Sequence, residues 1–435
     1  MARVADTVYG PISSDLGSSP LGDLCMPGDG VQTGPFGSQL HSSDYVDDGT
    51  PIITVEHLGD NRILHENLPR VHDSDRERLS KYALRTGDIV FSRVGSVDRR
   101  AIVHAEEEGW LFSGRCLRVR PDPAKIDGGY LSWFFGFPGF KEHIRQIAVG
   151  ATMPSLNTRI LSDVPIYFPP NVQEQRAIAH ILGALDDKIE LNRRMSETLE
   201  AMARAIFKSW FVDFDPVRAK AAGRQPAGMA QGVADLFPDG FEESELGEIP
   251  QGWRVASLGD LVEFAYGKAL RERERRPGTV PVFGSNGQVG WHDESIASGP
   301  GIIVGRKGNP GIVTWAPTEF FCIDTTFYVV PGTKPASFPF LYYALTGQNL
   351  GSLSADSAVP GLNRNLAYMS RQLAPPPELL AAFDSQVYRL FQRLFQGQQE
   401  SRTLAALRDA LLPKLISGEL RVPDAERFVE EASLC

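Results

Sequence analysis

Two segments of the chain place apolar residues at alternating spacings of four and three, the pattern of helices that pack along a seam. The first spans residues 171–216, and its seam residues are Ile178, Leu182, Leu185, Ile189, Asn192, Ser196, Leu199, Ala203, Ile206 and Trp210. The second spans residues 377–420, and its seam residues are Phe383, Val387, Leu390, Leu394, Gly397, Ser401, Leu404, Arg408, Leu411 and Leu415. At about 1.5 Å per residue, each helix is expected to be roughly 60 Å long.

The two seams are mostly apolar toward their ends and small or polar in the middle. In an antiparallel arrangement, Ile178 meets Leu415 and Asn192 meets Ser401, so that apolar residues face apolar residues and polar residues face polar residues. Parallel packing would also align the polar middles, but the connectivity favours the antiparallel arrangement, because the first helix leads into a globule that feeds the second. We therefore expect an antiparallel coiled coil. The pattern leaves open that each helix is only a core or dimerisation element.

Local signals give the ends of these helices. Asn171 is expected to cap the first helix, with Glu174 as its capping-box partner, and Pro216 is expected to stop it. The second helix is expected to begin at Pro377, since proline is tolerated in a first turn, and Gly418 fits its C-terminal stop.

The remaining sequence is duplicated. Residues 21–24, 91–95, 130–133 and 154–157 are matched by residues 258–261, 304–308, 340–343 and 360–363. The separation between matching segments falls steadily along the chain, so the second copy has lost loop residues while the order of elements is kept. A period this long indicates domain duplication and not a solenoid. A chain with two similar halves can present two related surfaces, which suits a target with an approximate two-fold axis such as DNA.

Each copy combines a loop-rich globule with one long helix. Short apolar runs split by glycine, proline and aspartate, such as 49–54, 88–91, 301–304 and 327–330, predict a mixed α/β globule. We expect globules at 1–170 and 248–376, a linker at 217–247 and a C-terminal tail at 421–435. An equal alternative to a linker at 217–247 is that these residues form a surface segment of the second globule. The predicted fold class is α+β, with two mixed α/β domains separated by two long helices that form an antiparallel coiled coil.

Composition and motifs narrow the chemistry. The net charge of −10 excludes a generally basic nucleic-acid coat, so any DNA contact depends on local basic clusters or partner subunits. No zinc-like spacing relates the four cysteines, which are Cys25, Cys116, Cys322 and Cys435. We find no nucleotide-binding, metalloprotease or hydrolase motif, and we predict neither a catalytic site nor a metal site. Residues 1–20 lack an apolar signal core and no run approaches the roughly 18 apolar residues of a membrane span, so we expect a cytoplasmic protein.

Basic and amide side chains in glycine-containing loops are the candidates for DNA contact, because they can reach phosphates and base edges. The candidates are Ser38, Gln39, Arg93, Arg99, Arg100, Asn157, Lys268, Ser285, Asn286, Arg306, Lys307 and Asn363. Arg93 and Arg306 occupy equivalent places in the two copies. The alternatives are solvated surface for the charges and plain turns for the loops. The aromatic residues at 210–214 are expected to pack and not to stack on bases.

Several stretches resemble the specificity (S) subunits of type I restriction–modification systems. The most specific are 173–182, 186–192, 207–216 and 411–420, and 34–38, 87–90 and 306–308 fit the looser pattern of the globules. The resemblance covers nearly the whole chain. It departs mildly at the start of the second helix, where Pro375-Pro-Pro-Glu-Leu-Leu replaces the Pro-Pro-Asn-Val-Gln-Glu of the first copy.

The resemblance implies a bacterial defence protein with two target-recognition domains, each reading one half of a bipartite DNA sequence. It implies that the helices set the spacing and dock two methyltransferase (M) subunits, and that two restriction (R) subunits complete the complex. The S subunit has no activity and no cofactor of its own; the M subunits use S-adenosylmethionine to methylate adenine, and the R subunits use ATP and Mg. Two other hypotheses are a scaffold that organises proteins without reading DNA, and an enzyme with an unrecognised site.

Overall fold

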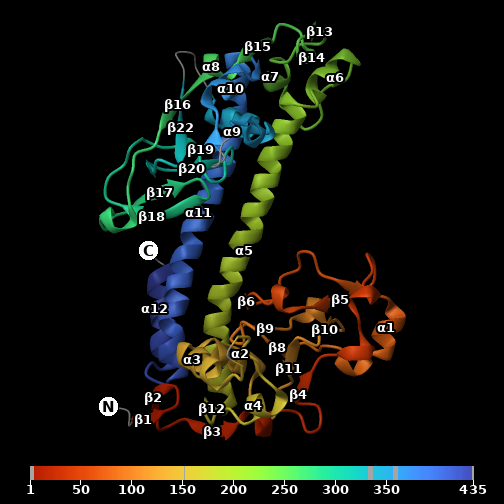
Figure 1. The fold of residues 1–435 in the computed structure, drawn as a ribbon, viewed down its shortest axis with the longest axis vertical. Helices are drawn as coiled ribbons and strands as arrows, with labels where there is room; N and C mark the ends of the chain where they lie inside the picture. The colour runs from red at the N-terminus through yellow and green to blue at the C-terminus, as the bar shows by residue number, and fades with distance from the viewer. Residues whose placement is uncertain (1–3, 151, 332–336, 356–360, 434–435) are drawn as a thin grey trace. The chain divides into compact units, whose positions relative to one another are not determined.

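The computed structural model describes residues 4–150, 152–331, 337–355 and 361–433, and it divides into two compact units (Figure 1). The first unit holds residues 1–190 and 401–435, and the second holds residues 191–400. Each unit therefore contains one globule, one part of the first long helix and one part of the second. No helix in the described part of the chain is long and apolar enough to span a membrane.

The first globule is built on small sheets. A five-stranded sheet has the order β4 (Val31–Thr33), β11 (Cys116–Val119), β8 (Ile89–Ser92), β9 (Arg100–Ile102) and β6 (Asp60–Asn61). A three-stranded sheet has the order β10 (Leu111–Phe112), β5 (Thr50–Ile53) and β7 (Arg70–Val71). Two-stranded pairs join β1 (Val4–Thr7) to β2 (Gly10–Ser13) and β3 (Gly17–Pro20) to β12 (Pro165–Phe168). The helices are α1 (Asp73–Arg78), α2 (Gly128–Gly136), α3 (Pro138–Ile147) and α4 (Thr158–Ser162). Every residue of β8 and β11 is buried, because these strands lie inside the larger sheet.

The second globule repeats this plan. A four-stranded sheet has the order β16 (Val262–Tyr266), β22 (Thr326–Pro331), β19 (Gly301–Gly305) and β20 (Val313–Ala316). A three-stranded sheet has the order β18 (Gly287–His292), β17 (Val280–Gly284) and β21 (Phe321–Cys322). The pairs are β13 (Phe241–Ser244) with β14 (Gly247–Pro250), β15 (Arg254–Ser257) with β25 (Arg371–Ala374), and β23 (Ser354–Ala355) with β24 (Gly361–Leu362). The helices are α8 (Leu258–Leu261), α9 (Phe338–Gly347) and α10 (Arg364–Met369).

Matching hydrogen bonds show that the duplication extends to the backbone. The amide of Ser113 donates to the carbonyl of Ile53 at 2.9 Å, and the amide of Ile323 donates to the carbonyl of Phe283 at 3.0 Å. In both copies this bond sits beside a short parallel strand pair, β5 with β10 and β17 with β21. The predicted α+β class with a repeated globule is confirmed.

The two long helices are α5 (Val172–Phe211) and α11 (Pro377–Ile416), each 40 residues long and drawn as an unbroken coil in Figure 1. In the second unit, Asn192 Nδ2 donates to Glu400 Oε2 at 2.9 Å, and the rings of Phe211 and Phe383 lie 5.0 Å apart. Residue numbers therefore rise along one helix as they fall along the other, so this part of the pair is antiparallel, as predicted.

In the first unit the same two helices meet again. Arg408 Nη1 donates to Asp186 Oδ1 at 2.7 Å, and Ile178 and Leu415 belong to one buried cluster. The buried residues of the predicted seam are Ile178, Leu182, Leu185, Asn192, Ala203, Trp210, Phe383, Val387, Gly397, Leu411 and Leu415. The half-buried residues of the seam are Ile189, Ser196, Leu199, Ile206, Leu390, Leu394, Ser401, Leu404 and Arg408.

Three of the four helix ends follow their local signals. Asn171 Oδ1 accepts a hydrogen bond from the amide of Gln173 at 2.9 Å, as a capping side chain does. The expected stop at Pro216 is wrong: helix α5 ends at Phe211, Phe214 adopts a left-handed φ of 56°, and Pro216 lies in the first turn of the next short helix. Helix α11 ends at Ile416, and Gly418 has a φ of 73°, the conformation that favours glycine just past a helix.

Two segments differ from the expected linker and tail. Residues 217–247 include α6 (Asp215–Ala221), α7 (Gln231–Ala234) and β13, and Val217 and Phe237 are buried in the core of the second unit. This segment is therefore part of the second unit, which is the alternative to a linker. Residues 421–435 include α12 (Val422–Ser433), whose Ala425 is buried in the core of the first unit. In both cases a few apolar residues anchor a segment that is otherwise polar.

Phe383 offers a test of the packing between the helices. It is fully buried, with ring contacts to Trp210 and Phe211, so Phe383→Ala leaves a cavity in the second unit. We expect a loss of about 3–5 kcal/mol in the free energy of unfolding, measured by urea titration with tryptophan fluorescence. The matched control is Phe428→Ala, since Phe428 is 51% exposed and its truncation should change stability little. Equal effects of the two substitutions would contradict this packing.

Candidate nucleic-acid interface

In the first globule, Arg93 lies just after β8 and is fixed by three hydrogen bonds. Its amide donates to the carbonyl of Arg115 at 2.8 Å, and its Nη1 donates to the carbonyl of Gly114 at 3.1 Å. Its carbonyl accepts from the amide of Leu156 at 2.9 Å. These bonds join three loops that are far apart in sequence, and they hold a half-buried guanidinium at the end of the sheet.

In the second globule, Arg306 lies just after β19 and makes the same three bonds. Its amide donates to the carbonyl of Thr325 at 2.8 Å, its Nη1 donates to the carbonyl of Asp324 at 3.2 Å, and its carbonyl accepts from Leu362 at 2.9 Å. We call this construction the arginine frame of each globule. The prediction that Arg93 and Arg306 occupy equivalent places therefore agrees with the geometry, although no DNA contact follows from the frame alone.

Asn157 and Asn363, each one residue further along, cap short helices. Asn157 Oδ1 accepts from the amide of Ile160 at 2.8 Å at the start of α4. Asn363 Oδ1 accepts from the amide of Leu366 at 3.2 Å at the start of α10. The alternative that these residues form plain turns therefore explains the hydrogen bonds that their side-chain oxygens accept. Pro360, which precedes the second of these turns, lies outside the described residues.

An aromatic ring joins the second arginine frame. Tyr266, at the end of β16, is 47% exposed. The guanidinium carbon of Arg306 lies 4.8 Å from the centroid of this ring, and that of Arg364 lies 5.0 Å from it. Lys307 is exposed and its backbone bridges to Gly361. We call Tyr266, Arg306, Lys307 and Arg364 the Tyr266 patch.

Sequence reasoning missed Tyr266 and Arg364. Arg364 directly follows the repeated segment 360–363, whereas Tyr266 adjoins none of the repeated segments. That adjacency was the available signal for Arg364. The ring contact itself depends on strands that the sequence does not place side by side.

The other candidates of the second globule lie on neighbouring loops. Asn309 Nδ2, in the loop that follows Arg306, donates to Asn286 Oδ1, so this loop touches the turn between β17 and β18. Gly308, in the same loop, lies close to Ser285, because a β-carbon at this glycine would be 3.4 Å from Ser285 Oγ. Lys268 is exposed, and its amide donates to the carbonyl of Cys322 at 2.9 Å. The structure thus places Ser285 and Asn286 beside the loop of the second arginine frame.

In the first globule, the candidates Gln39 and Arg99 form hydrogen bonds within the globule. Gln39 Oε1 accepts from the Tyr82 hydroxyl at 2.7 Å, and Arg99 Nη2 donates to the carbonyl of Leu58. Both side chains therefore already have partners within the globule. The side chain of Ser38 lies outside the described residues. Phe36, on the same loop and missed by sequence reasoning, is 63% exposed and borders a cavity of about 630 Å³.

The structure contradicts the expectation that Arg100 contacts DNA. Its side chain is only 2% exposed, and its Nη1 pairs with Asp60 Oδ1 at 3.0 Å. Its Nε donates to the carbonyl of Ser132 at 3.2 Å. Burial lowers the pKa of the guanidinium, and the Asp60 carboxylate opposes that effect. Asp60 in turn pairs with Arg408 of α11 at 3.3 Å, so Arg100 ties the globule to the helix within the first unit.

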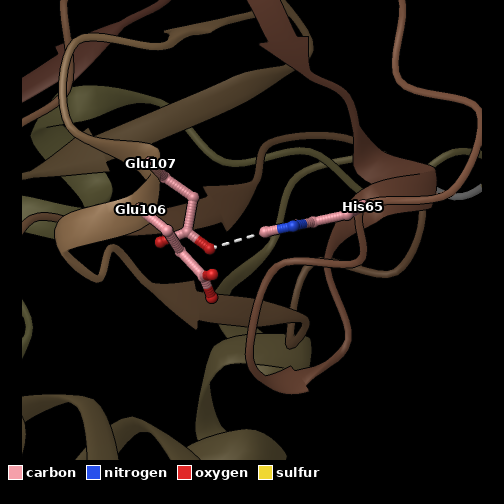
Figure 2. Close-up of side chains that lie close together, drawn as sticks. All are labelled: His65, Glu106 and Glu107. Atoms are coloured by element: carbon pink, nitrogen blue, oxygen red, sulfur yellow. Dashed lines mark hydrogen bonds and ion pairs between the residues drawn. The ribbon is translucent and has the colours of Figure 1, made fainter. Parts of the chain in front are cut away.

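One group in the described part of the chain has the spacing of metal ligands: His65, Glu106 and Glu107 (Figure 2). His65 Nε2 lies 2.8 Å from Glu107 Oε1, and Glu107 Oε2 accepts from the amide of His104 at 2.6 Å. Hydrogen bonds within the chain thus engage both oxygens of Glu107, and we assign no metal to the group. Burial raises the pKa of the Cys25, Cys116 and Cys322 thiols to about 12, so these cysteines are not poised as thiolate ligands.

Comparison with known proteins places this geometry in context. Residues 19–201 match the family model described as the type I restriction modification DNA specificity domain. The chain is 26% identical over 443 residues to the type I restriction enzyme HindI specificity subunit of Haemophilus influenzae, covering 85% of this chain and 95% of that protein. It is 25% identical over 325 residues to the MjaIX specificity subunit of Methanocaldococcus jannaschii, covering 68% of this chain and 69% of that protein.

A solved structure shares the fold. The S subunit of a type I restriction–modification system from M. genitalium matches with a TM-score of 0.65 and 18% identity, covering 92% of this chain and 96% of that one. The likeness extends over both globules and both long helices of this chain. The chain therefore carries the DNA specificity domain of type I restriction–modification systems and is a relative of their specificity (S) subunits.

Proposed function

We propose that this chain is the non-catalytic specificity subunit of a type I restriction–modification complex, in which each globule reads one half of a bipartite DNA sequence. The repeated arginine frame is the observation that carries the proposal. Two globules hold an arginine by the same three hydrogen bonds, and they surround it with different side chains. A common frame with different surroundings suits a protein that makes the same kind of contact with two different half-sites.

We propose further that the two long helices set the distance between the half-sites and dock two M subunits. In each unit they pair in opposite directions, so neither helix can shift along the other without losing its partners. Their lengths are equal at 40 residues, which suits a symmetric pair of docking positions. Two R subunits would complete the complex. S-adenosylmethionine would belong to the M subunits, and ATP with Mg to the R subunits.

The charge of the chain supports a shared role in DNA binding. A net charge of −10 opposes tight binding of DNA by this chain alone, because duplex DNA is itself strongly negative. We therefore propose that M subunits supply much of the phosphate contact. The globules would then contribute selectivity more than affinity.

Methylation mapping tests the proposed function. The chain is co-expressed with its methyltransferase partner in a host without adenine methylation, and methylated adenines are mapped along the genome. We expect one bipartite motif with a fixed gap, and none when the chain is omitted. Methylation without a bipartite motif would contradict the proposal. Complex formation without any sequence-selective DNA binding would favour a scaffold.

Shortening both helices tests whether they set the gap. Deletion of residues 189–195 and 394–400 removes one heptad from each helix and keeps both seams in phase. Each helix loses about 10 Å at 1.5 Å per residue, close to 3 base pairs at about 3.4 Å each. We expect the mapped gap to shorten or activity to be lost. The control exchanges the same residues for another apolar-seamed heptad, which should keep the original gap. A shortened pair that still methylates the original motif would contradict the proposal.

A further inference from the structure

Two arginines share one exposed aromatic ring in the Tyr266 patch. Arg306 lies 4.8 Å and Arg364 lies 5.0 Å from the centroid of Tyr266. Each guanidinium lies over a second ring as well, Arg306 over Phe327 at 5.7 Å and Arg364 over Tyr368 at 5.8 Å. A guanidinium stacked on rings uses its face, and its N–H edge remains able to bind a further partner.

The positive charges of this patch are not balanced within the described part of the chain. There, Arg306, Lys307 and Arg364 form no ion pair with a carboxylate. Arg276 of the same globule shows the contrast, since it pairs with Asp293 at 2.7 Å and Glu294 at 2.6 Å. Like charges held close together repel, and a bound anion would relieve that repulsion.

Backbone contacts hold both arginines in place. Arg306 Nη1 donates to the carbonyl of Asp324 at 3.2 Å, and Arg364 Nη1 approaches the carbonyl of Phe264 at 3.4 Å. A guanidinium has five N–H donors, so one backbone contact each leaves most of them for a ligand. The side chains are thus ordered before any ligand arrives, which reduces the entropy lost on binding.

We propose that Arg306 and Arg364, held against Tyr266, each bind a phosphate of the DNA backbone beside the half-site of the second globule. This inference rests on the proposed function and assigns a role to Tyr266 and Arg364. The ring positions the two cations, and each guanidinium donates hydrogen bonds to a phosphate. A phosphate contact fixes the orientation of the globule on the duplex without reading sequence.

The first globule lacks this site. Thr33 pairs with Leu117 at the end of β4, as Tyr266 pairs with Phe327 at the end of β16. Thr158 follows the capping Asn157. The same frame therefore carries threonine at both positions where the second globule carries tyrosine and arginine. Salt should accordingly weaken the contact of the second globule with DNA more than that of the first.

Salt-dependent DNA binding by the full chain in complex with its methyltransferase partner tests the site. Binding of a duplex that carries the mapped motif, and of a scrambled duplex, is measured by anisotropy over a salt series. We expect Arg364→Gln to weaken binding to both duplexes by a similar factor, on the order of tenfold, and to lower the salt slope by about 0.9. Arg276→Gln is the matched control and should leave the slope unchanged. Arg364→Lys should retain most of the slope.

Three results would overturn the inference. One is an unchanged salt slope for Arg364→Gln in a complex that still prefers its motif. This result would rule out the phosphate site and leave the proposed function intact. Another is a loss confined to the motif duplex with altered preference at one base pair, which makes Arg364 a base-reading residue. The last is a wild-type complex without any preference for the motif, which would rule out the proposed function as well.

Discussion

The antiparallel pairing of the two long helices is the constraint on which the rest of the structure depends. Each helix supplies one part of its length to each unit, so neither globule is complete without residues from both helices. Near the middle of the pair the seam turns polar, where buried Asn192 donates to Glu400 and lies against Gly397. A buried polar residue at one point of a seam disfavours other alignments of the helices, because a shift would leave its amide without a partner. The ends of the pair are apolar and provide the stability.

On that support, each globule reuses one loop construction. The arginine frame joins a strand end, a turn and the segment before a short helix by backbone hydrogen bonds, which do not depend on the side chains around them. Surrounding residues are therefore free to differ between the copies. Phe36 is exposed beside the first frame, and Tyr266 with Arg364 surrounds the second. Such a division between a fixed backbone and variable side chains would allow new half-sites to be read without a new fold.

The helices and the duplication could be predicted from sequence, because heptad spacing and repeated motifs are local patterns. The direction of the helices could be predicted from the order of the elements along the chain. The linker could not, since Val217 and Phe237 are isolated apolar residues whose burial depends on the core of the second unit. Arg100 was misassigned for a related reason. Its partner Asp60 is distant in sequence, and a buried paired arginine has the same local pattern as an exposed one. The Tyr266 patch depends on strand pairing in the same way, so only Arg306 and Lys307 of this patch could be named as candidates from the sequence.

A chain with two identical globules gives the most direct test of the account. The second globule is replaced by a copy of the first, both long helices are kept, and adenine methylation by the complex is mapped. The account predicts a motif whose two halves are the same and inverted, with the gap unchanged, because the helix pair sets the distance and each globule reads its own half. Retention of the original motif, with two different halves, would contradict it.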